Sequence, residues 1–140
     1  AQMATAWRYY EQAKAAARES GDKSFEAHAT AEQAFVLIDM GETSNAVEQI
    51  VHVRSSTRRQ APRILMAWLS AACGEAYAAD NRRGAALRAF DEADSLLALP
   101  KQEASCPYVV LDAVHLARWR GHALACWLCR GRRCVEDRSQ

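Results

Sequence analysis

An internal repeat of 40 residues is the feature that most restricts what this chain can fold into. Three sets of positions are in register: Ala6, Ala46 and Ala86; Tyr10, Ile50 and Phe90; and Ala13, Val53 and Ala93. Each copy therefore has the order small, large, small at a helical spacing. Small side chains let two helix backbones approach, and the large one fills the gap between neighbouring pairs. The repeat predicts helix hairpins that stack on one another.

Composition and periodicity agree with a helical chain. Half of the 140 residues are apolar, and Ala and Leu dominate them, which favours helices over strands. The apolar spacing predicts six helices, over residues 4–18, 23–40, 43–53, 62–79, 83–97 and 108–128. We therefore expect an all-α fold, an α-solenoid of antiparallel helix pairs over residues 1–128. A basic, frayed tail over residues 129–140 is expected to follow.

One copy of the repeat carries a known signature. Cys73, Gly74, Tyr77, Ala86 and Phe90 have the order and spacing of the tetratricopeptide motif, in which Gly-x-x-Tyr precedes Ala-x-x-x-Phe. The chain resembles this family strongly over residues 67–100 and fairly over 27–60, where Ala34 and Leu37 replace Gly and Tyr. Ser70 stands where the family prefers Trp. The period of 40 exceeds the usual 34 of the family, so the helices or their connections must be longer.

A narrower resemblance concerns regulatory proteins. Three stretches of the sequence are similar to the repeat region that follows a helix-turn-helix in actinobacterial transcriptional regulators. They are Glu32-Gln33-Ala34-Phe35 with Leu37, the Ala-rich hairpin around Tyr77, and His115-Leu116-Ala117-Arg118-Trp119-Arg120-Gly121-His122. No helix-turn-helix is visible here, and the helical pattern is already under way at Ala1. We expect the chain to be a fragment of a longer protein, with any DNA binding by the parent outside these residues.

The tetratricopeptide resemblance implies a binding groove. In that family, the first helix of each pair lines a concave groove whose polar and aromatic side chains grip a peptide or small ligand. Carried over residue by residue, the resemblance implies groove residues His28, Phe35, Asp39, Trp68, Glu75, His115, Arg118 and His122. Trp68 would be the aromatic anchor, and Glu75 and Asp39 would select a cationic group. The competing interpretation is that Phe35 and Trp68 are ordinary core and that His28 is an ordinary surface residue.

A cluster near the C-terminus has the residue types of a zinc site. His122, Cys126, Cys129 and Cys134 supply one imidazole and three thiols, and the first three share a helical face. Zinc sites hold such a cysteine pair in a turn, whereas this pair lies within or at the end of a helix, and no second Cys-x-x-Cys accompanies it. We therefore expect no metal, with Cys126 in apolar packing, and a redox role for Cys126 and Cys129 is less expected still.

Catalytic and nucleic-acid functions have little support. No strand-turn-helix elbow surrounds a Ser or Cys, and no Gly-rich phosphate loop occurs, so we expect neither enzymatic activity nor a cofactor. The basic run Arg54, Arg58, Arg59 and Arg63 would suit phosphate contacts, but exposed connections often carry such charge, and nucleic-acid binding through it is not expected. Residues 1–50 carry 4 basic and 8 acidic side chains, and residues 51–140 carry 14 and 9, so an acidic partner could face one half.

The remaining features concern location and role. No apolar run approaches the roughly 20 residues of a membrane span, and no secretory leader precedes the helices, so a cytoplasmic protein without membrane contact is expected. We predict a protein- or peptide-interaction module of a bacterial regulator, with self-association through the solenoid ends as a further mode. The alternative is a small-ligand sensor. A sensor should have a closed apolar pocket around Trp68, and a peptide binder an open polar channel.

Overall fold

A computed structural model describes residues 2–100 and 106–137, with side chains as far as residue 126. This part of the chain is entirely helical and contains no strand, which confirms the predicted class. The helices are α1 (Gln2–Ser20), α2 (Lys23–Asp39), α3 (Thr43–Thr57), α4 (Arg63–Ala79), α5 (Arg83–Ala98) and α6 (Ala113–Asp137). The starts of α2 and α4 are 40 residues apart, as are those of α3 and α5.

The turns between the helices use residues that tolerate a left-handed backbone. Gly41 has φ 82° after α2, and Asn81 has φ 60° at the same place after α4. Glycine pays no Cβ penalty there, and Asn is one of the few other residues that enters this region readily. Asp22 then caps α2, because its carboxylate accepts a hydrogen bond of 2.9 Å from the Phe25 backbone N–H.

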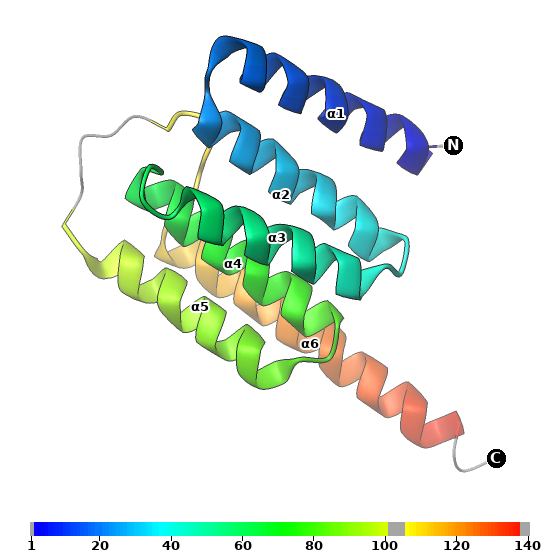
Figure 1. Ribbon diagram of the computed structural model, residues 1–140. Coiled ribbons are helices and arrows are strands. Elements are labelled where there is room, and N and C mark those ends of the chain that lie inside the picture. Colours follow the sequence, from blue (N-terminus) through cyan, green and yellow to red (C-terminus); the bar gives the residue numbers. More distant parts are fainter. Residues whose placement is uncertain (1, 101–105, 138–140) are drawn as a thin grey trace.

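The helices form two layers (Figure 1). α2, α4 and α6 are neighbours in one layer, since α4 contacts both α2 and α6. α3 packs against α2 and α4, and α5 packs against α4 and α6, so these two helices belong to the other layer together with α1, which contacts α2. Among the described residues, no helix is both long and apolar enough to cross a bilayer.

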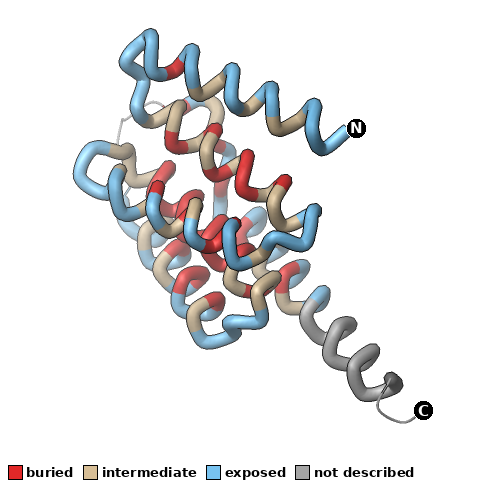
Figure 2. The backbone as a smooth tube through the Cα atoms, turned by 45° about the vertical axis from the view of Figure 1, so that its right-hand side comes forward, coloured by how far each residue is buried: buried red, intermediate tan, exposed pale blue. Residues whose placement is uncertain are grey.

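The core is centred on α4, which contacts α2, α3, α5 and α6. Buried residues follow α4 and the inward sides of α2, α3 and α5, whereas most of α1 is exposed (Figure 2). The closest approach joins α4 to α5 at Gly74, where an added Cβ would come within 2.7 Å of the Phe90 ring. The small and large positions of the repeat therefore interlock here, with Ala86 and Ala93 buried beside them.

Three predicted helix boundaries were wrong. α3 continues to Thr57 rather than ending near Val53, and α6 begins at Ala113 rather than Tyr108. Asp112 caps α6 by accepting a 2.8 Å hydrogen bond from the backbone N–H of His115. The preceding residues 106–112 are not helical, and Val109 and Leu111 of this segment are buried in the core. α6 also runs across the predicted boundary at residue 128 and reaches Asp137.

Candidate functional site

A cluster of aromatic rings joins the three helices of the α2–α4–α6 layer. Trp68 of α4 is at its centre, with its ring centroid 4.4 Å from His28 and 6.2 Å from Phe35, both on α2. Trp119 of α6 completes the group at 5.9 Å from Trp68 and 6.1 Å from Phe35. Aromatic rings at these separations attract one another beyond the area that they bury. The cluster therefore fixes α6 against the other two helices.

The segment before α6 extends this cluster along α2. The Tyr108 ring lies 5.1 Å from His28 and 5.3 Å from Phe25, edge-on to the latter. Burial is the largest cause that raises the pKa of the Tyr108 hydroxyl, and the nearby Cys106 raises it further. Residues 106–112 thus run along the start of α2 before entering α6 (Figure 1).

This packing decides the role of the proposed anchor. Trp68 is only 7% exposed, and three rings of the same chain surround it. The interpretation of Trp68 as core is the one that its burial favours, and it is not an open anchor for a partner. The same rings occupy the space that a small apolar ligand would need around it.

Three carboxylates are coupled to one another beside the aromatic cluster, and one of them bonds Trp119. Glu75 of α4 accepts a hydrogen bond from the indole Nε1–H of Trp119. Burial raises the pKa of Glu75, and the negative charge of Asp39 raises it further, whereas the hydrogen bond and His122 lower it. Burial also raises the pKa of Glu32, and the negative charge of Glu75 raises it further. The negative charges of Glu32 and Asp39 are therefore both coupled to that of Glu75, and we call these three carboxylates the carboxylate face.

Few positive charges balance the carboxylate face. Among the described side chains, no Lys or Arg lies within 4 Å of these three carboxylates. The His28 imidazole lies 3.7 Å from Glu32, but burial lowers the pKa of His28, which favours its neutral form. His122 is the other basic group near Glu75. Among the side chains that the structure describes, little positive charge therefore compensates the carboxylate face.

Local sequence spacing explains how the face is built. Glu32 and Asp39 are seven residues apart on α2, and Trp68 and Glu75 are seven apart on α4, which places each pair on one side of its helix. Trp119 and His122 are three apart on α6. The structure thus brings together His28, Phe35, Asp39, Trp68, Glu75 and His122 among the predicted groove residues.

Two predicted residues are exposed and outside the cluster, and three participants were missed. His115 and Arg118 are exposed on α6, and the His115 ring nitrogen lies 3.1 Å from the Asp112 carboxylate at the start of that helix. Glu32, Tyr108 and Trp119 were not among the predicted groove residues. The signal for Trp119 was its position four residues after His115 and three before His122, on the same helical side. Tyr108 had no such signal, because it lies outside any helix.

The cysteine cluster is only partly described. Cys126 Sγ lies 3.6 Å from His122 Nε2, and Cys126 is exposed rather than packed in apolar surroundings as predicted. Cys129 and Cys134 lie outside the residues whose side chains are described. Within the described part of the chain, no group of three His, Cys, Asp or Glu side chains could hold a metal ion.

The basic run at the end of α3 is partly neutralised. Arg54 Nη1 lies 3.3 Å and Arg58 Nη2 3.4 Å from the two carboxylate oxygens of Glu92 on α5. Two of the four arginines of this run are therefore engaged in a contact between helices, whereas Arg59 is exposed.

Comparison with protein-family models, with curated proteins and with solved structures finds no match to this chain in any of the three.

Proposed function

We propose that this chain is an interaction module of the tetratricopeptide type, and that its carboxylate face binds a Lys or Arg side chain of a protein or peptide partner. The observation that carries the proposal is the set of three carboxylates, Glu32, Asp39 and Glu75, without a Lys or Arg partner among the described side chains. The module would serve as the sensory or assembly part of a bacterial regulator.

A bound cation relieves a cost that the free protein carries. The carboxylates of Glu32 and Glu75 are partly removed from water, and Glu75 also feels the negative charge of the exposed Asp39. An ammonium or guanidinium group beside them gains charge-assisted hydrogen bonds, each worth about 1.5–3 kcal/mol. The aromatic cluster beneath holds α2, α4 and α6 in fixed positions, so the carboxylates are already in place before binding.

A peptide partner fits this face better than the alternative of a small apolar ligand. The rings of His28, Phe35 and Trp119 already fill the surroundings of Trp68. The polar groups come from α2, α4 and α6, which are neighbours in one layer, and an extended peptide can cross such a surface. We therefore propose that Glu75, rather than Trp68, determines which partner the carboxylate face binds.

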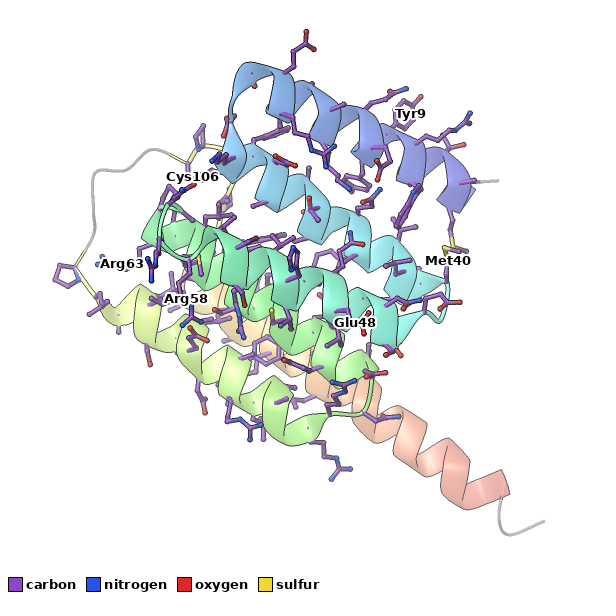
Figure 3. All side chains as sticks on the ribbon, viewed as in Figure 1. Tyr9, Met40, Glu48, Arg58, Arg63 and Cys106 are labelled. Carbon is purple, nitrogen blue, oxygen red and sulfur yellow. The ribbon has the colours of Figure 1, made fainter. Side chains whose placement is uncertain are left out.

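A peptide array tests the proposal. Short peptides that share a flexible background and differ at one central position (Lys, Arg, Gln or Glu) are probed with the full chain at low and high salt. We expect binding to the Lys and Arg peptides, weaker at high salt, and a loss of about tenfold, or 1.4 kcal/mol, in Glu75→Gln. The control Glu48→Gln, on the exposed side of α3 (Figure 3), should bind as the parent does. Equal signals from the Lys and Glu peptides would reject the proposal.

A further inference from the structure

The repeat produces two equivalent junctions between neighbouring helix pairs. At the first junction α1 and α3 flank α2, and at the second α3 and α5 flank α4. The 40-residue register relates the two junctions, because α2 and α4 begin at Lys23 and Arg63, and α3 and α5 at Thr43 and Arg83. Residues at equivalent positions can therefore be compared directly.

A carboxylate closes the second junction. Glu92 of α5 receives Arg54 Nη1 on one oxygen at 3.3 Å and Arg58 Nη2 on the other at 3.4 Å. The two arginines lie one turn apart on α3, and Arg58 projects from the end of that helix toward α5 (Figure 3). One carboxylate thus bridges two cations across α4.

The first junction has the same two cations without that carboxylate. Lys14 and Arg18 of α1 are in register with Arg54 and Arg58. Their exposed fractions are similar: the side chains of Lys14 and Arg54 are 12% and 15% exposed, and those of Arg18 and Arg58 are 56% and 59% exposed. Lys14 also pairs with Glu11 and Arg18 with Glu26, two acids whose positions 40 residues later are Val51 and Met66. The position of Glu92 is taken by His52.

A cavity of about 430 Å³ lies at the first junction, lined by Lys14, Arg18, Lys23, Glu26 and His52 together with small polar and apolar residues of α2 and α3. Its volume lies within the range typical of sites for small molecules. Three of its lining side chains are cationic and one is anionic.

The contacts already present leave donors for a ligand. Lys14 Nζ lies 3.0 Å from Glu11 and donates to Gln33 Oε1 at 3.0 Å. Arg18 bonds Glu26 through Nε, which uses one of the five N–H donors of a guanidinium. The hydroxyls of Thr30 and Thr57 donate to backbone carbonyls, so the cationic groups are the ones that can recognise an anion.

We propose that the first junction is an anion-binding site, in which the carboxylate or phosphate group of a small molecule takes the place that Glu92 holds at the second junction. The anion bridges Lys14 and Arg18, as Glu92 bridges Arg54 and Arg58, and Lys23 adds a third positive charge at the edge. This site is lined by α1, α2 and α3, includes none of the three carboxylates of the carboxylate face, and does not depend on the function proposed there.

Titration of the full chain with inorganic phosphate and, separately, with acetate tests the site, followed by ¹H–¹⁵N NMR at constant ionic strength. We expect saturable shifts at the cavity residues of α1 and α3 with at least one of the two anions, and the stronger response names the preferred chemistry. His52→Glu supplies the carboxylate from the chain itself, so it should abolish the response and leave the fold intact.

Two further variants keep the test decisive if His52→Glu folds poorly. Arg18→Gln should weaken anion binding at least tenfold, and Arg88→Gln, an exposed substitution on α5 outside the cavity, should bind anions as the parent does. The absence of saturable shifts with both anions at tens of millimolar would overturn the proposal. Equal responses in the parent and in Arg18→Gln would overturn it as well.

Discussion

The first helix pair, α2 with α3, and the second pair, α4 with α5, follow the same register but have different interiors. The second pair is apolar and tightly interlocked, with Gly74 against the Phe90 ring and Cys73 buried beside it. At the position of Cys73 the first pair has Gln33, which is fully buried and bonds Lys14, Glu11 and Gln49. The two copies of the repeat therefore differ in their interiors. The second pair supplies the stable core, and the first pair carries polar groups.

The largest expected difference concerns Trp68 and its counterpart His28, which is 40 residues earlier. Trp68→Ala removes a ring at the centre of the core and should cost about 3–5 kcal/mol of unfolding free energy, whereas His28→Ala should cost about 1 kcal/mol. Urea unfolding followed by circular dichroism measures both. Similar losses in the two variants would show that the pairs do not differ in the way described.

Two glycines, Gly74 on α4 and Gly121 on α6, test how closely the helices approach one another. Gly74→Ala should destabilise by about 1–3 kcal/mol, because the new methyl group meets the buried Phe90 ring. Gly121→Ala on α6 meets nothing within 4 Å, and the higher helix propensity of Ala should stabilise by up to about 1 kcal/mol. Thermal melts of the two variants should move in opposite directions. A shift of both to higher temperature would contradict the tight approach at Gly74.

These contrasts also show what the sequence could predict. The helix starts at residues 23, 43 and 83, and the start of α4 to within one residue, were predictable from the apolar spacing and from the turn residues that precede them. The start of α6 was not, because the burial of Val109 in an extended segment depends on tertiary packing. The carboxylate face was half predictable: Asp39 and Glu75 followed from the family resemblance, whereas the pairing of Trp119 with Glu75 joins residues 44 positions apart.

The bridge at the second junction should have a moderate effect. Glu92→Gln removes the charge that balances Arg54, whose side chain is 15% exposed, and should cost about 1 kcal/mol. The matched change at the first junction, His52→Gln, removes no such bridge and should be nearly neutral. Chemical denaturation of both variants at neutral pH provides the measurement. A larger loss of stability in His52→Gln than in Glu92→Gln would contradict the assignment of a bridging residue to the second junction and not to the first.

The smallest effect concerns the pH dependence of stability. Burial raises the pKa of Glu75 in the folded protein, so the stability that this group contributes is full below its unfolded pKa and is lost as the pH rises through the folded pKa. Glu75→Gln should therefore be more stable than the parent at pH 7, and the gain should shrink toward pH 4. Denaturant midpoints at the two pH values measure it. A gain of equal size at both would mean that the charge of Glu75 is not the cause.

The most direct test of the carboxylate face follows the indole N–H of Trp119, which bonds Glu75. Its ¹H–¹⁵N signal, assigned by its disappearance in Trp119→Phe, is recorded while the tightest-binding Lys peptide of the array is added. The account predicts a saturable shift in the parent, none with the matched Gln peptide, and a strongly weakened response in Glu75→Gln. An indole signal that stays unmoved while the peptide binds, or that moves equally in Glu75→Gln, would contradict a cation site at this face.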